Sequence, residues 1–198
     1  CGCDNGCNGG CNAAPTCGCD GGHAAPAAPA MDGDAPPMPP APVVDLADAF
    51  GLGSVVVKDE SNRFGLPSFK MLGASWATYR TLVDLLGQEP DWSTVDELAE
   101  QLAPLRPLTL TTATDGNHGR AVAHMAALLG FAARIFVPDD MVPARIEAIE
   151  AEGAEVVVVE GSYDDAVAVA AAAGDVVIAD TGAGDAPAWV IEGYSTMF

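Results

Sequence analysis

The feature that most constrains this chain is a regular alternation of short apolar runs and helical segments between residues 108 and 178. The predicted strands are 108–112, 134–137, 155–159 and 175–178, and the predicted helices between them are 118–129, 143–151 and 164–172. Such alternation is typical of an α/β fold with a mostly parallel sheet. Ligands of these sheets bind at the carboxyl ends of the strands, where Lys70, Asp115 and Asp180 fall.

Upstream of the alternating region the pattern predicts one strand and two helices. Three consecutive valines within 54–58 indicate a short strand buried on both faces. Apolar spacing predicts a helix over 71–86 that stops at Gly87, which places Lys70 at the helix entrance. A capping-box pattern predicts a further helix over 93–103.

The first 42 residues have a different composition from the rest. Residues 1–42 are rich in Gly, Ala, Pro, Cys and Asn and have no period that could bury a face, which predicts a disordered segment before an ordered region over 43–198. Within it lie all the cysteines, Cys1, Cys3, Cys7, Cys11, Cys17 and Cys19. They lack the C-x-x-C spacing of zinc sites, so no metal is expected. A chain beginning with cysteine fits a processed terminus, a lipidated cysteine or a missing true start, and we favour the last.

Composition excludes some partners. The formal net charge is −20, with 8 basic against 28 acidic residues, so the chain would repel a phosphate backbone and nucleic acid is not an expected partner. Apolar stretches are interrupted before they reach bilayer length, so no membrane span is expected. The cysteine-free core is typical of a reduced, cytoplasmic enzyme. A length of 198 residues fits either one domain or part of a larger enzyme.

Lys70 is the first candidate for chemistry. It ends the polar run 57–70, which follows the predicted strand, and Lys58 is the other lysine of the chain. A Schiff-base lysine presents its amine to an aldehyde, and desolvation with a nearby helix N-terminus lowers its pKa. The alternative is an ordinary solvated lysine on the surface.

The second candidate is the run 111–120, which joins a predicted strand to a helix. Its backbone amides, short hydroxyl groups and Asn117 at a helix N-terminus could hold a substrate carboxylate. The alternative, of equal weight without the first run, is an ordinary helix cap in which Asp115 or Asn117 binds free amides.

Both runs resemble those of fold-type-II pyridoxal-phosphate enzymes. Ser68-Phe69-Lys70 matches their Ser-x-Lys cofactor motif, and Gly116-Asn117-His118 matches their asparagine loop. Within that superfamily the segments 58–66, 112–120 and 192–197 are similar to the diaminopropionate ammonia-lyase family, and the resemblance covers about Pro42 to Phe198. It implies the N-terminal portion of a three-layer parallel-sheet architecture, left incomplete by this chain.

The resemblance also implies roles for individual residues. Lys70 would bind pyridoxal 5'-phosphate covalently, with Phe69 and Asn117 as further cofactor contacts. Asp115, where related dehydratases and cysteine synthases have serine, and Asp180 would take the α-proton from the two substrate enantiomers. Substrate-binding residues would be Thr114, Asp115, Gly116 and His118. Asp180 could instead be an ordinary strand-end residue, because the loop 182–186 that follows departs from the family's Trp-x-Gly-Tyr segment.

The activity that the resemblance implies is conversion of 2,3-diaminopropionate to pyruvate and ammonia by β-elimination. A later Gly-rich phosphate loop and a partner for the pyridine nitrogen are missing, so we expect a fragment, a truncated product or one half of a split enzyme, inactive by itself. A homodimer or a complementing C-terminal half is the expected partner. The alternatives are a serine or threonine dehydratase, a β-replacing enzyme and a noncatalytic remnant. His124, Trp76, Trp189 and Tyr194 are interpreted as packing residues.

Overall fold

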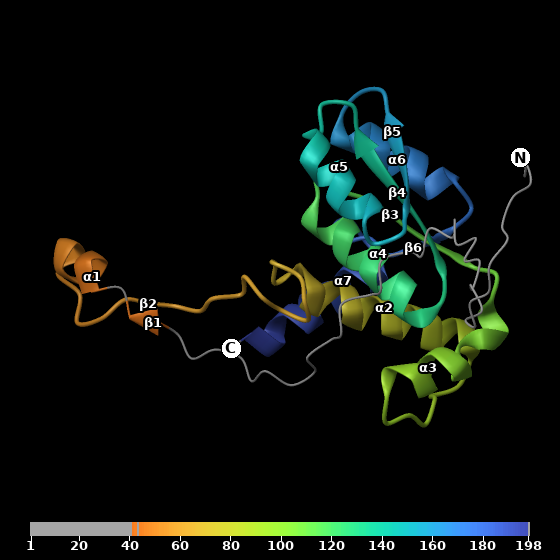
Figure 1. The fold of residues 1–198 in the computed structure, drawn as a ribbon, viewed down its shortest axis with the longest axis horizontal. Helices are drawn as coiled ribbons and strands as arrows, with labels where there is room; N and C mark the ends of the chain where they lie inside the picture. Colours follow the sequence, from red (N-terminus) through yellow and green to blue (C-terminus); the bar gives the residue numbers. More distant parts are fainter. Residues whose placement is uncertain (1–40, 43, 198) are drawn as a thin grey trace, which may run out of the picture. The chain divides into compact units, whose positions relative to one another are not determined.

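The computed structural model describes residues 41–42 and 44–197, all within one compact unit. Helices alternate with strands along most of this range (Figure 1). The helices are α1 (Val44–Phe50), α2 (Lys70–Leu86), α3 (Val95–Gln101), α4 (Asn117–Leu129), α5 (Pro143–Glu150), α6 (Tyr163–Ala172) and α7 (Asp185–Tyr194), with 3-10 turns at Ala103–Leu105 and Ser195–Met197. The strands are β1 (Ala41–Pro42), β2 (Val56–Val57), β3 (Thr109–Ala113), β4 (Ala132–Pro138), β5 (Glu155–Val159) and β6 (Val176–Val177).

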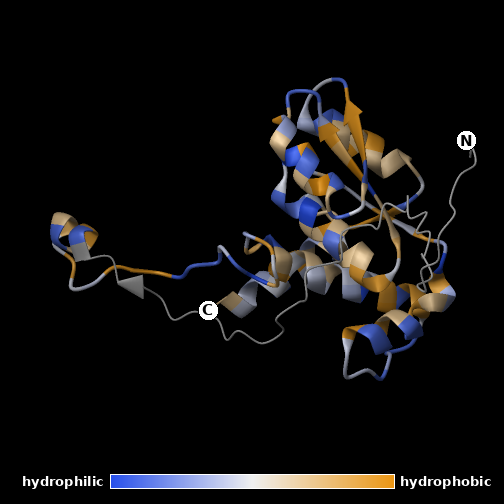
Figure 2. Cartoon of the chain, viewed as in Figure 1, coloured by the Kyte–Doolittle hydropathy of each residue, from blue (hydrophilic) through white to orange (hydrophobic). Residues whose placement is uncertain are grey.

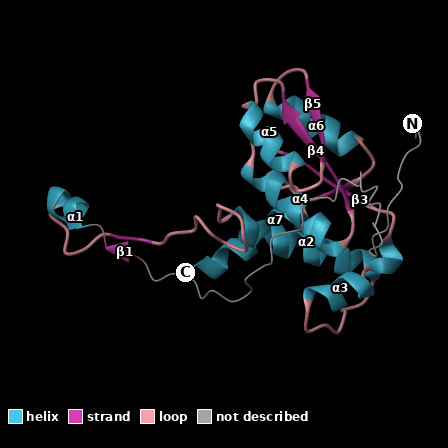
Figure 3. Ribbon diagram, in the orientation of Figure 1, coloured by secondary structure: helices cyan, strands magenta, loops and turns pink. Residues whose placement is uncertain are grey.

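The main sheet has four parallel strands in the order β5-β4-β3-β6. The chain runs outward from β3 to β5 and then returns to the other side of β3 to form β6. This return reverses the direction of winding, so α6 covers the opposite face of the sheet from α4 and α5 (Figures 1 and 3). The predicted α/β fold with a parallel sheet is therefore confirmed.

The two faces of the sheet have separate apolar cores. Ile135 and Val137 of β4 belong to a large buried cluster with residues of α2, α4 and α5, whereas Phe136 between them packs with Ala166 and Ala170 of α6. This is the alternation that a strand covered on both sides requires. The hydropathy colouring shows the same apolar strands inside the layers of helices (Figure 2).

Helix α2 packs against both α4 and α7 beside the sheet. Helix α2 ends at Gly87, which adopts φ 75°, and this confirms the predicted stop. Helix α3 starts at the predicted capping box, in which Thr94 and Glu97 bind each other's backbone amides. Helix α7 crosses α2 at two glycines, and this contact carries Tyr194 toward the start of α2.

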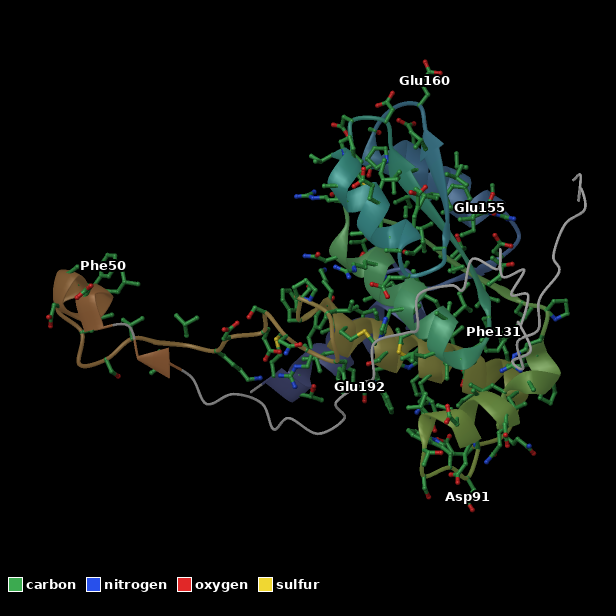
Figure 4. The ribbon with its side chains drawn as sticks, in the orientation of Figure 1. Phe50, Asp91, Phe131, Glu155, Glu160 and Glu192 are labelled. Carbon is green, nitrogen blue, oxygen red and sulfur yellow. The ribbon has the colours of Figure 1, made fainter. Side chains whose placement is uncertain are left out.

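The strand predicted over 54–58 differs from expectation. Strand β2 contains two residues and pairs antiparallel with β1 alone, outside the parallel sheet. Val56 and Val57 are 59% and 49% exposed, because no layer of described residues covers either face of this pair. Phe50 of α1 is also exposed (Figure 4). A valine run therefore did not mark a buried strand here.

The predicted disordered segment 1–42 lies outside the described residues except for Ala41–Pro42, which form β1. The six cysteines lie outside them as well. Across residues 41–42 and 44–197, no cluster of three or more His, Cys, Asp and Glu side chains is placed to bind a metal ion. None of the helices described is long and apolar enough to cross a bilayer.

Candidate active site

A cavity of about 520 Å³ opens at the carboxyl ends of the parallel strands. Its volume lies within the range of small-molecule sites. The residues that line it are Lys70, Thr114, Asp115, Gly116, Asn117, His118, Arg145, Tyr163, Asp180 and Thr181. The structure thus brings every predicted site residue except Phe69 to the cavity wall. Phe69 directly precedes α2 and does not line the cavity.

Lys70 forms an ion pair with Asp180 across the cavity. Lys70 is the first residue of α2, and its backbone amide donates to the Ser68 hydroxyl at 3.1 Å. Its Nζ donates to Asp180 Oδ2 at 2.9 Å, and the two side chains are 29% and 12% exposed. Asp180 follows β6, so the register between β3 and β6 places this carboxylate opposite the lysine.

The pKa of Lys70 is raised from its usual value, although the sequence led us to expect a lowered one. Burial lowers the pKa of this ammonium and is the largest single effect. The hydrogen bond to Asp180, together with the proximity of Tyr194, outweighs burial. The Tyr194 hydroxyl is buried and has no hydrogen-bond partner among the described residues. The expectation was wrong because it did not include the Asp180 carboxylate.

Two aromatic rings flank the lysine amine. Phe69 and Tyr194 meet edge to face, with ring centroids 5.1 Å apart. Lys70 Nζ lies 5.7 Å from the centroid of Phe69 and 5.4 Å from that of Tyr194, within the range of cation–π contacts. Tyr194 does pack, as predicted from the sequence, but it packs against the candidate catalytic amine.

The loop between β3 and α4 is held by Thr114. Its Oγ1 accepts hydrogen bonds from the backbone amides of Gly116 and Gly119, each at 3.0 Å. Gly116 adopts φ 143°, which favours glycine, and a Cβ on Gly119 would clash with the side chain of Thr114. Thr114 therefore shapes this loop, and the exposed side chains of Asp115 and Asn117 contribute to the cavity wall.

Arg145, at the start of α5, is a cavity residue that the sequence analysis missed. Its Nη1 donates to the Asp115 carbonyl oxygen at 2.8 Å. Tyr163 and Thr181 were missed as well, and their hydroxyl oxygens are 3.4 Å apart. The available signal was positional, since all three follow predicted strands and so lie at the edge of the sheet where ligands bind.

His118 is almost fully buried beneath Lys70 and Asp180. Its Nε2 lies 2.7 Å from the carbonyl oxygen of Ile178, and its Nδ1 lies 3.8 Å from Asp180 Oδ2. Burial, partly offset by the Asp180 carboxylate, lowers the pKa of this imidazole. His124, by contrast, pairs with Glu152 at 2.8 Å on the side of α4 that faces the end of α5, outside the cavity.

Comparison with known proteins places this chain in a family. The family model described as pyridoxal-phosphate dependent enzyme matches residues 36–198. Diaminopropionate ammonia-lyase of Escherichia coli K12 is 38% identical over 168 residues, which cover 81% of this chain and 42% of that protein. The Salmonella typhimurium enzyme of the same name is 39% identical over 163 residues, covering 77% and 40%.

A solved structure shows the same relationship. The crystal structure of the Escherichia coli diaminopropionate ammonia-lyase in complex with D-serine matches with a TM-score of 0.75 and 37% identity, over 82% of this chain and 43% of that one. The chain thus spans less than half the length of these relatives.

The residues of the cavity fit the cofactor that the family name specifies. A primary amine, the group that condenses with an aldehyde, lies at the cavity wall between two aromatic rings. The cavity is large enough for a small planar ring, and exposed Asn117 offers amide donors on another wall. With its parallel sheet and its lysine at the carboxyl edge, this chain belongs to the family of pyridoxal-phosphate-dependent enzymes.

Proposed function

We propose that this chain forms part of an ammonia-lyase that converts 2,3-diaminopropionate to pyruvate and ammonia. The observation that carries the proposal is the presence of two carboxylates, Asp115 and Asp180, in one cavity with the amine of Lys70. The likeness to the two diaminopropionate ammonia-lyases supports the choice of substrate. Elimination requires a base for the α-proton, and a carboxylate on each side of a substrate can serve both enantiomers.

The cofactor, when bound, acts as an electron sink for the carbanion that proton removal creates. Lys70 would hold it covalently, and Phe69 and Asn117 would contact its ring. As a nucleophile Lys70 must be neutral, and the nearest acceptor for its proton is Asp180 Oδ2 at 2.9 Å. Asp180 therefore receives this proton first, and it must release it again before it can serve as a base.

The start of α4 would bind the substrate carboxylate. No hydrogen bond among the described residues uses the amides of Asn117 and His118, the first two of the helix. Amides at a helix N-terminus attract anions. A carboxylate bound there would lie beside Asp115, whose own carboxylate attracts the ammonium groups of the substrate. Arg145 fixes the Asp115 backbone through its carbonyl oxygen.

We also infer that the chain alone binds the cofactor weakly. Lys70 and Arg145 are the Lys and Arg residues among those lining the cavity, Lys70 is paired with Asp180, and Arg145 donates to a backbone carbonyl. A phosphate dianion is held most firmly by several charge-assisted hydrogen bonds, and Arg145 is the one cationic side chain of this lining that is not in an ion pair.

The first experiment adds pyridoxal phosphate to the chain, traps the adduct with borohydride and maps it by peptide mass spectrometry. Lys70→Arg and Lys58→Arg form a matched pair, because these two are the lysines of the chain. We expect the label on Lys70, abolished by the first substitution and retained after the second. Equal labelling of both lysines would contradict the cofactor site.

The second experiment incubates the cofactor-loaded chain with D- or L-diaminopropionate in heavy water and measures α-deuteration and pyruvate. We expect Asp115→Asn and Asp180→Asn each to lose exchange with a different enantiomer. If Asp115→Ser kept exchange with both enantiomers and gained exchange with serine, the dehydratase alternative would replace this one. A chain that labels Lys70 yet exchanges neither enantiomer would match the inactive fragment expected from the sequence as well as the noncatalytic remnant.

A further inference from the structure

The buried imidazole of His118 has one nitrogen that the proposed chemistry leaves unused. A carbonyl oxygen only accepts hydrogen bonds, so the 2.7 Å contact to Ile178 fixes the proton on Nε2. Nδ1 then carries a lone pair, and it is a buried atom without a hydrogen-bond partner among the described residues. Buried polar atoms in this state are rare and need an explanation.

The group that faces this lone pair is the Asp180 carboxylate, with Oδ2 at 3.8 Å. Both are acceptors while Asp180 is ionised, which accounts for a separation longer than a hydrogen bond. The same Oδ2 atom accepts from Lys70 Nζ at 2.9 Å. Lys70, Oδ2 and Nδ1 therefore form a row in which one carboxylate oxygen lies between an amine and an imidazole.

We propose that His118 is a positioning residue for Asp180, whose bare Nδ1 shares the proton that Asp180 takes from Lys70. The proton leaves Nζ for Oδ2, and the carboxylic acid then donates to Nδ1, so no charge is created or lost in the row. This deepens the proposed function and rests on it, because the proposed function requires Asp180 to be protonated when Lys70 becomes a nucleophile.

The surroundings of the imidazole support a neutral starting state. The ionisable groups that face His118 are Asp180, whose charge favours protonation, and Lys70 from α2, whose charge opposes it. Burial is the largest influence and lowers the pKa of His118. Removal of the lysine charge leaves the carboxylate as the unopposed neighbour, and Nδ1 should then gain proton affinity.

The test is a nitrogen-15 NMR titration of His118 in the cofactor-free 198-residue chain, which separates Nδ1 from Nε2. We expect Lys70→Met to raise the titration midpoint of Nδ1 by about one pH unit. Lys70→Arg, which keeps the positive charge, should leave it unchanged. Adding Asp180→Asn to Lys70→Met should remove the rise. An unchanged midpoint in Lys70→Met would overturn the proposal.

A second measurement uses a variant that keeps the structural bond. In His118→Gln the amide nitrogen can still donate to the Ile178 carbonyl oxygen, while the acceptor oxygen of the amide sits on the terminal carbon and not in the place of Nδ1. We expect His118→Gln to slow reductive methylation of Lys70 at neutral pH roughly threefold, equivalent to half a pH unit, with Lys58 as the internal reference. An unchanged Lys70 rate would contradict the sharing. Neither measurement requires cofactor or substrate. The two measurements can therefore give the expected result when labelling by pyridoxal phosphate fails, and labelling can succeed when they do not.

Discussion

The contact between α2 and α7 provides a sharp test of the packing that holds Tyr194 near Lys70. A Cβ on Gly193 would lie 2.5 Å from the Leu72 carbonyl oxygen and 2.9 Å from Gly73 Cα. Both are backbone atoms, so no change of rotamer can relieve the clash. Gly193→Ala therefore requires the two helices to separate by about 0.9 Å before ordinary van der Waals contact at 3.4 Å is restored.

Two opposing effects determine the magnitude. Overpacking of this kind costs about 1 to 3 kcal/mol. Alanine in place of glycine inside a helix contributes about 0.5 to 1 kcal/mol in the stabilising direction. The difference between the two runs from about 0 to 2.5 kcal/mol. Because the clashing atoms belong to the backbone, we expect the upper part of this range, a loss of about 1 to 2.5 kcal/mol in the free energy of unfolding. With a urea slope of about 2 kcal/mol per molar, the midpoint falls by about 0.5 to 1.2 M.

The assay is urea unfolding of the chain followed by circular dichroism. Gly53→Ala is the control, because a Cβ there has nothing within 4 Å and its backbone is not in the left-handed region. Its midpoint should stay close to that of the parent chain. If the Gly193→Ala midpoint were equal or higher, helix propensity alone would account for the result and the close approach of α2 and α7 would be wrong.

Three other predictions concern single side chains. Thr114→Val, which loses hydrogen bonds to two loop amides, should cost about 1 to 3 kcal/mol in urea unfolding, and Thr114→Ser should recover most of it. The Glu60 carboxylate, bound chiefly by Arg63, has its pKa lowered to about 2 from 4.5, so its stabilising contribution is complete above pH 4.5 and lost as pH falls toward 2; carbon-13 NMR showing a midpoint near 4.5 would refute this. Leu82→Ala should cost about 2 to 5 kcal/mol, and exposed Leu85→Ala on the same helix much less.

The parallel sheet could be predicted because its signals are local. The apolar runs and the glycines that follow the helices lie within a few residues of one another, and the observed bounds differ from the predicted ones by a few residues at most in the alternating region. Helix α7 was not predicted. It contains Gly193, which disfavours a helix interior, and it forms through close packing against α2 that no local pattern reveals.

For the site, too, the local motifs could be predicted and the contacts between distant residues could not. The loop after β3 and the lysine before α2 could be found as short motifs, since each is continuous in the sequence. The pairing of Lys70 with Asp180 joins residues 110 positions apart and depends on β6 adding to β3 instead of to β5. Sequence reasoning therefore placed both residues at one edge of the sheet but gave the wrong direction for the pKa of the lysine.

That ion pair imposes an order on any chemistry in the cavity. While Lys70 is an ammonium, its proton binds Asp180 Oδ2 at 2.9 Å, and the carboxylate is not free to act on a substrate. Lys70 cannot attack a carbonyl group until this proton moves, and the raised pKa makes the proton harder to remove. Asp115 is exposed and has no such partner among the described residues, so it is free to act from the start. The two carboxylates thus differ in the stage at which they are available as well as in position. The rate of α-proton removal from an enantiomer that depends on Asp180 should therefore respond more strongly to the charge of Lys70 than the rate for one that depends on Asp115.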